Sequence, residues 1–507
     1  MQLESIQDLI SNSCILLTGV TGFVGGTLLE RILRIGPGPE KVFVLVRKRQ
    51  HVDPQVRFNE ILSSPLFSDV DPERLKRVQV IPGDITEEGL GLSSADSNLL
   101  ISKCNLVLHS AAFISFAAQL EMATRINLLG SRHVLGLAKN MPNIRAMVHV
   151  STAYANCTVG TSRLDEKLYP TGIDSVDFIH TVKNMTSQEI ERRTAEFIEN
   201  HPNTYTFSKQ MAENLLAKER EHVPLAIVRP SIVLNTWKVP KPGWVDNVNS
   251  GACAFIAGVT KGLFRTFQGR PDIRQDVIPA DMVVSTILAS ALYAARHPTD
   301  LHIFHCTSSM SNPSTWGKYC EEVTKFSRSE PCKNVVWYPD AKPRSNFFRN
   351  AAVMYIFQLL PAHVIDLLGT VAKRKNGLVD IQHRYIKGCK YTAYFAENEW
   401  VFSRKRTLSL INMLSPEERE AHPMDPALIN WSEYFKNCVI GMRRYFHKEP
   451  AESTESACRQ MARLRIIAAV TPYLSFYLLW TFLYLSGCSS EVAIFLSAAL
   501  VIFLTWL

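Results

Sequence analysis

The sequence predicts an α/β fold with a doubly wound parallel sheet, followed by a mostly helical C-terminal domain and C-terminal transmembrane segments. Three observations predict it. Short apolar runs alternate with segments of helical periodicity through the first half of the chain. Three glycines lie where the first apolar run meets the first helical segment, and two uncharged stretches close the sequence. A chain of 507 residues also exceeds what one hydrophobic core usually covers, so we expect more than one domain.

The first joint carries Gly19, Gly22 and Gly25, between the apolar run "SCILLTGV" and the helical pattern "GGTLLERILRIG". In a Rossmann-type unit that binds a dinucleotide, the first glycine permits a tight turn, the second lets the pyrophosphate approach the backbone, and the third allows close helix packing. The helix N-terminus then donates its amides to phosphate. A plain glycine-rich turn is the alternative, and the elements that follow favour the nucleotide site.

The next predicted strand, "KVFVLV" at residues 41–46, is followed directly by "RKR" at Arg47–Arg49. An acidic residue at this place selects NAD by binding the ribose hydroxyls, whereas cations accept the 2′-phosphate of NADP. The sequence therefore predicts NADPH as the cofactor, with a solvated basic turn as the alternative.

Three more predicted strands end in small or polar residues. "VQVIPGDI" ends near Asp84, "NLVLHSAAFISF" continues into Ala111 and Ala112, and "AMVHVSTAY" reaches Thr152 after the helical pattern "NLLGSRHVLGLAKN". Ligands of a doubly wound sheet bind at the carboxyl ends of its strands. We therefore expect these residues and Gly22 to lie along one edge, where the alanines leave space for a flat ring.

A candidate catalytic group lies in "NTYTFSKQMAENLLAKE", which has a helical pattern. Tyr205 and Lys209 are four residues apart and share one face. A phenol with a pKa of about 10 is a poor acid or base at neutral pH, and a nearby ammonium stabilises its phenolate. Ser151 or Thr152 can hydrogen-bond a substrate oxygen that gains negative charge. Alone, the Y-x-x-x-K spacing is more typical of an exposed helix face.

The segments "TGVTGFVG", "GDI", "HSAA", "VSTAY" and "YTFSK" occur in an order that resembles the extended short-chain dehydrogenase/reductase superfamily. The resemblance implies catalytic roles for Thr152, Tyr205, Lys209 and Ser151, and for Asn127, which matches an asparagine that helps to order a proton relay. It also implies a set of cofactor-binding residues: Thr18, Gly19, Thr21, Gly22, Phe23, Val24, Gly25, Arg47, Lys48, Asp84, Ile85, Ala111, Ala112, Tyr205, Lys209 and Pro230.

Further along, "IVRPSIV", "DVIPADMVV", "NPSTWGKYCE", "EWVFS" and "INWSEYFKNCVIGMRRY" resemble the fatty acyl-CoA reductases, enzymes of lipid biosynthesis. One departure is "WVDNVNS", which lacks an expected glycine-proline after its first asparagine and so puts the geometry of that loop in doubt. The resemblance implies reduction of a long-chain fatty acyl-CoA to a primary alcohol by two NADPH. The first hydride attacks the thioester and CoA leaves, and Tyr205 donates a proton when the second reduces the aldehyde.

The expected organisation follows the composition along the chain. Prolines and arginines near residues 335–350 suggest a linker, and the apolar stretch 351–373 holds Pro361, His363 and Asp366, which favours a broken helix over a further span. We expect these parts: a reductase domain at 1–335 that includes the substrate-binding part, a helical module at 350–447, a linker at 448–465, a transmembrane helix at 466–487 and a second membrane segment at 492–507.

The membrane prediction depends on two uncharged stretches. At 1.5 Å per residue, 466–487 reaches about 33 Å and 492–507 about 24 Å, so the first can cross a bilayer and the second is marginal. Arg459, Arg463 and Arg465 precede the first stretch, and such cations mark the cytosolic side. We therefore expect the reductase domain to face the cytosol, and the resemblance implies an endoplasmic reticulum or peroxisome membrane.

Charge and cysteine usage exclude other classes. The net charge of +8 is spread along the chain without a long basic run, so nucleic acid is not an expected partner. The 11 cysteines form no C-x-x-C pair and the histidines are isolated, so we expect free thiols and no metal. The expected partners are long-chain fatty acyl-CoA and membrane lipid. A membrane-bound NADP-dependent steroid or sugar-nucleotide dehydrogenase and a noncatalytic nucleotide-binding scaffold are the alternative functions.

Overall fold

The chain forms two compact units, each assembled from segments that are separated in the sequence. The computed structural model describes residues 4–49, 52–160, 163–246, 251–371, 377–450 and 454–506. Unit 1 comprises Met1–Ser250, Arg274–Ser314 and Glu399–Asn430, and unit 2 comprises Gly251–Ile273, Thr315–Asn398 and Trp431–Leu507. Parts of the predicted loop departure (247–250) and of the predicted linker (451–453) lie outside the described residues.

Unit 1 contains the predicted parallel sheet, and the doubly wound fold is confirmed. Its seven strands have the order β12-β7-β5-β4-β1-β2-β3, and all neighbours run parallel. The strand order reverses beside β1, which is where such sheets bind ligands. The strands are β1 (Cys14–Thr18), β2 (Lys41–Val46), β3 (Val78–Pro82), β4 (Leu106–His109), β5 (Ala146–Val150), β7 (Leu225–Pro230) and β12 (His302–Cys306).

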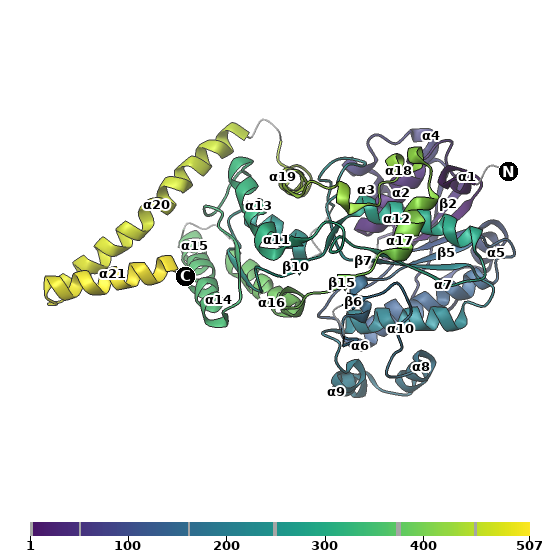
Figure 1. The fold of residues 1–507 in the computed structure, drawn as a ribbon, viewed down its shortest axis with the longest axis horizontal. Coiled ribbons are helices and arrows are strands. Elements are labelled where there is room, and N and C mark those ends of the chain that lie inside the picture. The colour runs from purple at the N-terminus through teal and green to yellow at the C-terminus, as the bar shows by residue number, and fades with distance from the viewer. Residues whose placement is uncertain are drawn as a thin grey trace. The chain divides into compact units, whose positions relative to one another are not determined.

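Helices cover both faces of this sheet (Figure 1). On one face lie α1 (Ile6–Ser11), α2 (Phe23–Arg34) and α12 (Ala280–Arg296), and on the other lie α5 (Ser94–Lys103), α7 (Gly130–Lys139) and α10 (Thr204–Glu219). A buried core joins Leu16 and Met147 of the sheet to Leu135 of α7 and Leu216 of α10. This core fixes α10, the helix that carries Tyr205, against the strand ends.

The remaining elements of unit 1 are short. The helices are α3 (Pro54–Leu62), α4 (Pro72–Leu75), α6 (Leu120–Ala123), α8 (Ser175–Lys183), α9 (Ser187–Ile198), α17 (Lys405–Met413) and α18 (Pro416–Ala421), with the π turn η3 (Thr124–Leu129) and the 3-10 turn η4 (Ala153–Asn156). Two small parallel pairs join β11 (Val277–Pro279) to β8 (Ile232–Leu234) and β15 (Val401–Phe402) to β6 (Arg163–Leu164).

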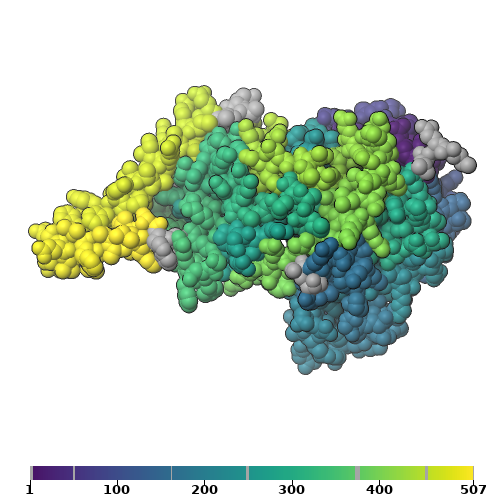
Figure 2. Space-filling model, in the orientation of Figure 1, coloured from purple at the N-terminus to yellow at the C-terminus, as the bar shows by residue number. Residues whose placement is uncertain are grey.

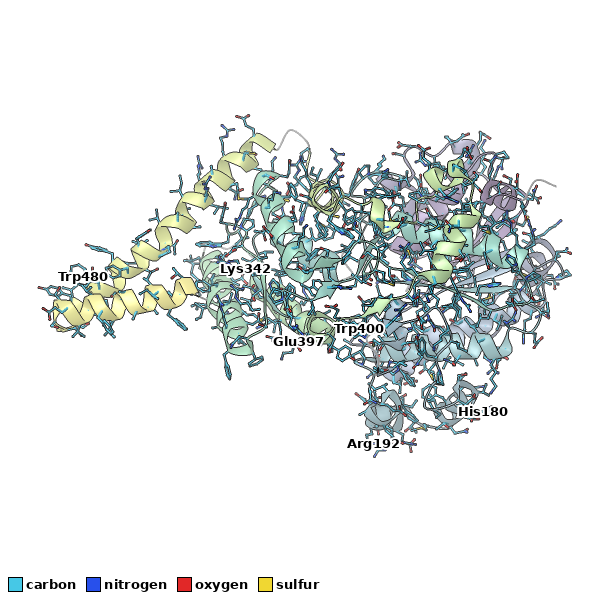
Figure 3. The ribbon with its side chains drawn as sticks, viewed as in Figure 1. His180, Arg192, Lys342, Glu397, Trp400 and Trp480 are labelled. Atoms are coloured by element: carbon cyan, nitrogen blue, oxygen red, sulfur yellow. The ribbon has the colours of Figure 1, made fainter. Side chains whose placement is uncertain are left out.

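Residues 177–202 of the insert between Thr152 and Tyr205 are mostly helical. Helices α8 and α9 each begin at a capping residue, and their buried aromatic residues pack with Phe207 of α10. His180 on α8 and Arg192 on α9, labelled in Figure 3, are exposed. The insert is thus attached to α10 by one apolar face, with its polar face in solvent.

Residues 399–430 belong to unit 1, although the sequence places them in the helical module. The buried carboxylate of Glu166 accepts hydrogen bonds from the backbone of His305, Arg406 and Thr407. Trp400 donates to the carbonyl of Cys157 at 3.0 Å. A single boundary near 335–350 therefore does not match the compact units, because composition along the chain cannot reveal a segment that returns to an earlier core.

Unit 2 is mostly helical, as predicted. It contains α11 (Gly251–Thr260), α13 (Trp316–Ser329), α14 (Phe347–Met354), the π turn η5 (Tyr355–Leu359), α15 (Leu360–Val371), α16 (Leu378–Glu397), α19 (Trp431–Gly441), the π turn η7 (Met442–Phe446) and the parallel pair β9 (Thr266–Gln268) with β14 (Lys342–Arg344). Its aromatic core includes Tyr319 of α13 against Phe435 of α19, and Phe264 stacked on Tyr385 of α16.

The predicted break in the apolar stretch 351–373 is wrong for its described part. Elements α14, η5 and α15 follow one another as one helix of 25 residues, Phe347–Val371, in which an 18-residue stretch has a mean hydropathy of 1.6. Pro361 lies directly after the π turn, a place where a helix accommodates a residue that lacks an amide hydrogen. By length and composition, the helix is long and apolar enough to cross a membrane.

Two apolar helices end the chain, α20 (Thr454–Leu485) and α21 (Ser490–Trp506). The predicted linker is therefore helical from Thr454 onward. Helix α20 is long and apolar enough to cross a membrane, and none of the 18 residues of its most apolar stretch is buried. Helix α21 is shorter. The side chains of the two helices, yellow in Figure 2, pack together, and Trp480 stacks on Tyr484 (Figure 3). These features suggest membrane association.

Candidate active site

The glycine loop is closed so tightly that side chains are excluded at two of its positions. Gly19 has a φ of 81°, and a Cβ there would lie 2.6 Å from the backbone nitrogen of Ala111. A Cβ on Gly25 would lie 2.1 Å from the carbonyl oxygen of Gly19. Within the described residues, a Cβ on Gly22 would meet just the Gly19 carbonyl, at 3.3 Å. The helix α2 begins directly after Gly22, so the unpaired amides at its N-terminus can donate hydrogen bonds to a phosphate that approaches the loop. The loop therefore fits a dinucleotide.

The end of β2 carries more positive charge than the sequence alone predicts. Arg47, Lys48 and Arg49 are exposed as expected. Arg57 on α3 donates to the carbonyl oxygen of Arg47, and the pKa of its guanidinium is lowered by partial burial and by the neighbouring arginines. Arg57 escaped the sequence reasoning because it lies on the following helix and belongs to no motif.

Thr152 and Tyr205 meet at the carboxyl end of β5. Thr152 is buried, and its hydroxyl lies 3.5 Å from the carbonyl oxygen of Pro230 and accepts from the amide of Tyr154 at 3.3 Å. Burial raises the pKa of the Tyr205 phenol to about 12, and a hydrogen bond with the Thr152 side chain partly opposes that rise. The phenol is therefore protonated at neutral pH and able to donate.

Lys209 has a partner that the sequence reasoning did not anticipate. Its ammonium is fully buried and donates to the carbonyl oxygen of Val150, the last residue of β5, at 2.8 Å. Burial lowers the pKa of Lys209 to about 8, and the charge of Glu213, one helical turn away, acts in the opposite direction. The ammonium thus ties α10 to the strand that delivers Thr152, and its expected influence on Tyr205 stays a prediction.

Asn127 lies on the π turn η3, and its side chain is fully engaged. The amide oxygen accepts from the backbone nitrogen of Phe113 at 2.8 Å, and the amide nitrogen donates to the hydroxyl of Ser208 at 2.9 Å. Ser208 directly precedes Lys209 on α10. π turns often occur at functional sites, and here the turn connects the segment after β4 to α10, which carries Tyr205 and Lys209.

Comparisons with known proteins agree with this geometry. Two family models, each described as male sterility protein, match residues 17–287 and 357–449. Fatty acyl-CoA reductase 1 of Rattus norvegicus is 33% identical over 471 residues, which cover 91% of this chain and 90% of the relative. Fatty acyl-CoA reductase 2 of Mus musculus is 32% identical over 477 residues, 93% of this chain and 92% of the relative.

The chain belongs to the fatty acyl-CoA reductase family. Solved structures agree on the fold alone. The terminal R domain from the myxalamid PKS-NRPS pathway has a TM-score of 0.57 at 17% identity, covering 85% of this chain and 90% of that one. The reductase domain of a nonribosomal peptide synthetase from Mycobacterium tuberculosis has the same TM-score and identity, with coverage of 85% and 91%. The chain shares the fold of these reductase domains.

The other predicted site residues of this fatty acyl-CoA reductase lie at strand ends along the same edge. Asp84 follows β3, where its carboxylate accepts from the amide of Thr86 at 2.9 Å, and the carbonyl of Ile85 contacts His133. Ser151 is buried, and its hydroxyl has no hydrogen-bond partner within the described part of the chain. The remaining positions lie at the end of β1 or in the loop after it, at the start of α2, after β4 and at the end of β7: Thr18, Thr21, Phe23, Val24, Ala111, Ala112 and Pro230.

A hydrogen-bonded chain connects Asn127 to the glycine loop. The Ser131 hydroxyl donates to the backbone carbonyl of Asn127 at 2.6 Å, so it accepts from Nε2 of His109 at 3.1 Å. Nδ1 of His109 then accepts from the hydroxyl of Thr18 at 2.7 Å. Burial lowers the pKa of His109 to about 3, so the ring is neutral and this assignment holds at physiological pH. His109 is the first residue of the motif "HSAA", in which the sequence analysis assigns a role just to the two alanines.

A buried ion pair holds α10 one helical turn after Lys209. Arg229 on β7 binds Glu213 on α10 through two hydrogen bonds, at 2.9 and 2.6 Å. The guanidinium also donates to the carbonyl of Lys167 at 3.0 Å and lies 3.3 Å from Nε2 of His305. Glu213 escaped the sequence reasoning because a carboxylate on a helix is ordinarily exposed.

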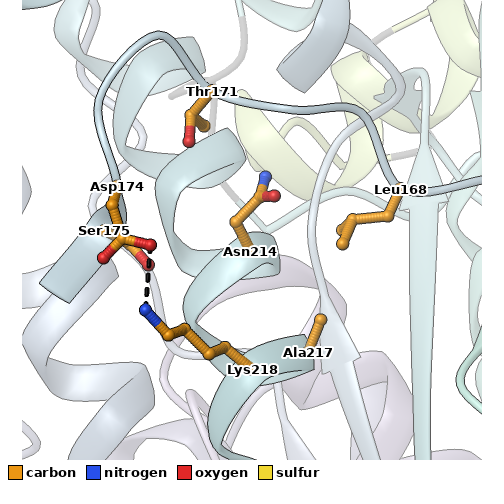
Figure 4. Close-up of a pocket in the computed structure, with 7 residues that line it drawn as sticks. All are labelled: Leu168, Thr171, Asp174, Ser175, Asn214, Ala217 and Lys218. Carbon is orange, nitrogen blue, oxygen red and sulfur yellow. Dashed lines mark hydrogen bonds and ion pairs between the residues drawn. The ribbon is translucent and has the colours of Figure 1, made fainter.

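Two cavities of unit 1 lie beside the insert. One, of about 290 Å³, contains the Lys218–Asp174 ion pair at 3.0 Å (Figure 4). The other, of about 200 Å³, lies between the ends of the insert and α10. Neither is lined by Thr152 or Tyr205. The candidate site of this reductase is therefore defined by its side-chain geometry. No group of three or more metal-binding side chains occurs among the residues that the structure describes.

Turnover is expected to fall as the pH rises through about 8, because Lys209 loses its proton there. The charge of Glu213 favours the ammonium, whereas the nearby rings of His109 and His149 are neutral at this pH because burial and the charge of Lys209 lower their pKa values. The pH dependence of kcat/KM checks this. Lys209→Arg keeps the charge and should move the fall to higher pH, and an unchanged profile in that variant would contradict the assignment.

The same group affects stability with the opposite sign. The pKa of Lys209 is lowered from 10.5 to about 8 in the folded protein. Between these values the unfolded chain binds more protons than the folded one, so the contribution of Lys209 to the free energy of unfolding rises with pH. Loss of activity in this window therefore cannot be ascribed to unfolding driven by Lys209.

Proposed function

We propose that this protein reduces a long-chain fatty acyl-CoA to the primary alcohol, consuming two NADPH and releasing CoA. The proposal is supported best by the contact between Thr152 and Tyr205. This contact lies beside the buried Lys209, at the sheet edge that carries the glycine loop. The family relationship supports the acyl-CoA substrate. Chain length and the complete alcohol-forming sequence are part of the proposal.

The residues have distinct tasks in this reaction. A bound dinucleotide supplies hydride. Thr152 and Tyr205 hydrogen-bond the substrate carbonyl oxygen and stabilise the negative charge that develops on it, first in the thioester and then in the aldehyde. Because its pKa is about 12, Tyr205 keeps its proton until the alkoxide needs it, and donates it there as a general acid. Lys209 holds α10 at the end of β5, so both hydroxyls stay directed at one oxygen.

Product analysis tests this function. The purified full chain is incubated with NADPH and a series of acyl-CoAs of increasing length, and products are identified by mass spectrometry. We expect a primary alcohol, free CoA and two NADPH oxidised per CoA. Turnover of a steroid or a sugar nucleotide without CoA release would favour the alternative dehydrogenase, and cofactor binding without any turnover would favour a noncatalytic scaffold.

The cofactor preference is proposed from the cations after β2. Replacing Arg47 and Lys48 together with alanine should raise KM for NADPH by about tenfold or more, because each charge-assisted contact to a 2′-phosphate is lost, and should change KM for NADH little. Steady-state kinetics with both cofactors measures this. Lys76→Ala, which removes an exposed lysine paired with Glu73, is the matched control. Equal weakening of both cofactors would place 2′-phosphate recognition elsewhere.

The localisation is also a proposal. We infer that α20 enters an endoplasmic reticulum or peroxisome membrane from the cytosolic side, since Arg459, Arg463 and Arg465 precede its apolar part. Protease treatment of sealed organelles containing the protein should digest unit 1. Complete protection of unit 1 from the protease would show that unit 1 lies on the opposite side of the membrane.

A further inference from the structure

The helix formed by α14, η5 and α15, here called the 347–371 helix, exposes large apolar side chains, while Asn350 and Gln358 are buried beside Val353 and Met354. Its polar residues Asn350 and Gln358 are buried, at 5% and 3% exposure, whereas Phe348 and Val371 are 81% and 78% exposed. A helix on the surface of a water-soluble domain shows the opposite arrangement, with an apolar face toward the core. The outward face therefore does not match water.

Hydrogen bonds fix the orientation of this helix on unit 2. The side-chain oxygen of Asn350 accepts from the hydroxyl of Thr266 in β9. Gln358 accepts from the amide of Thr266 at 3.1 Å and donates to Gln382 of α16 at 3.2 Å. The carboxylate of Asp366 accepts from the first two amides of α16, at 3.1 and 2.9 Å. Pulling the helix away would leave these buried groups unpaired, so it does not leave unit 2 to span a bilayer.

The outward face carries an apolar stripe, flanked by the exposed His363 and Thr370. Phe348, Tyr355, Leu360, Val364, Leu367 and Val371 are all between 48% and 81% exposed. The step of five residues from Tyr355 to Leu360 coincides with the π turn, which keeps both side chains on one face. Contiguous large apolar side chains at this exposure mark an interaction surface.

Charge and chain connection both indicate a phospholipid surface as the occupant of this stripe. Lys342, labelled in Figure 3, and Arg344 and Arg349 gather at the N-terminal end of the helix, and the pKa of Arg344, about 10, keeps it charged at neutral pH. Cations beside an immersed apolar face suit phosphate headgroups. A second copy of the chain would have to present a matching acidic patch beside an apolar face.

The start of α20, whose apolar part is the proposed membrane span, packs on the same part of unit 2. Met461 of α20 packs against Cys332 and Val335, and Gln460 donates to the carbonyl of Val335 at 3.0 Å. Residues 332–338 lead directly into β14 and the 347–371 helix. The start of α20 is therefore packed on the segment that leads into the 347–371 helix. A bilayer that contains the apolar part of α20 lies near this segment and hence near the apolar stripe.

We propose that the 347–371 helix lies in the headgroup region of a phospholipid bilayer, with the stripe from Phe348 to Val371 immersed in lipid. It forms a membrane contact separate from α20 and α21, and it holds unit 2 against the surface in which fatty acyl chains dissolve.

Photocrosslinking tests this contact in the full chain. Benzoylphenylalanine replaces Leu367, the protein is reconstituted into vesicles of phosphatidylcholine and phosphatidylserine, and adducts are identified by mass spectrometry after irradiation. Phe348 provides an independent second position, so the test survives a folding failure at either one. Leu408 on α17, which is 46% exposed in unit 1, is the matched control.

We expect at least about tenfold more lipid adduct at Leu367 and Phe348 than at Leu408, because only an immersed side chain is surrounded by acyl chains. Equal lipid labelling at all three positions would overturn the proposal, since the helix would then face water. Adducts to a second copy of the protein at Leu367 would also overturn it and would identify the stripe as a protein interface.

Discussion

Replacing Tyr205 with phenylalanine is expected to lower kcat by about 10³-fold, the upper part of the range for loss of a general acid that also binds the developing oxyanion. The phenol is the acidic group held at the Thr152 hydroxyl, and its pKa of about 12 makes it a donor at neutral pH. Phenylalanine keeps the ring against Phe116, so the packing around position 205 should be retained. Stopped-assay quantification of alcohol and free CoA measures the loss.

Two controls separate chemistry from structure in this experiment. NADPH binding to Tyr205→Phe, followed by fluorescence, should stay within about twofold of the unmodified protein, because the phenol oxygen is a small part of the cofactor site. Tyr293→Phe removes a phenol oxygen from α12, where the ring contacts His297 and Phe304, and should leave turnover unchanged. If Tyr205→Phe retained more than a tenth of normal turnover, another group would have to be the acid.

Replacing Arg229 with methionine is expected to lower the free energy of unfolding by about 3–5 kcal/mol. The side chains of Arg229 and Glu213 are 1% and 0% exposed, so the variant leaves a carboxylate buried in α10 without its counter-charge. It also removes the donors to the carbonyls of Asp165 and Lys167. Denaturant unfolding of the full chain in detergent, followed by a signal from unit 1, measures the change.

The double variant Glu213→Leu with Arg229→Met distinguishes an unpaired charge from lost packing. Removing both charges should recover much of the stability, because two apolar side chains of similar volume replace the pair. Arg193→Met breaks the exposed pair with Glu196 and should cause no measurable change. A double variant as unstable as the sum of its single variants would show that the interaction between the charges is not the cause.

Local signals were sufficient to predict much of the site. The sequence predicts Gly19 and Gly25 because a tight turn and a close approach exclude a side chain, and in the structure a Cβ added at either position would collide with the backbone. Tyr205 and Lys209 were placed together because helical spacing fixes which residues share a face. The strand ends at Asp84, Ala112 and Thr152 followed from the rule that parallel strands end at a common edge.

Contacts between distant segments were not predictable in the same way. Glu166 holds residues 405–407 through hydrogen bonds to backbone amides, which leave no trace in side-chain pattern. The link from Asn127 through Ser131 and His109 to the glycine loop joins elements around β1 and β4 that have no periodic relation in the sequence. The π turns η3 and η5 likewise arise within segments whose composition is ordinary for an α-helix.

The sequence by itself determined the parallel sheet, the glycine loop, the helix that carries Tyr205 and Lys209, and the apolar character of α20 and α21, because each depends on backbone geometry or periodicity within a short segment. Only the tertiary structure decided which groups are buried together. Burial sets the pKa of Lys209 near 8 and that of Tyr205 near 12, and packing against β9 and α16 turns the polar residues of the 347–371 helix inward. Both effects depend on the solvent and partners that remote segments of the chain remove or provide.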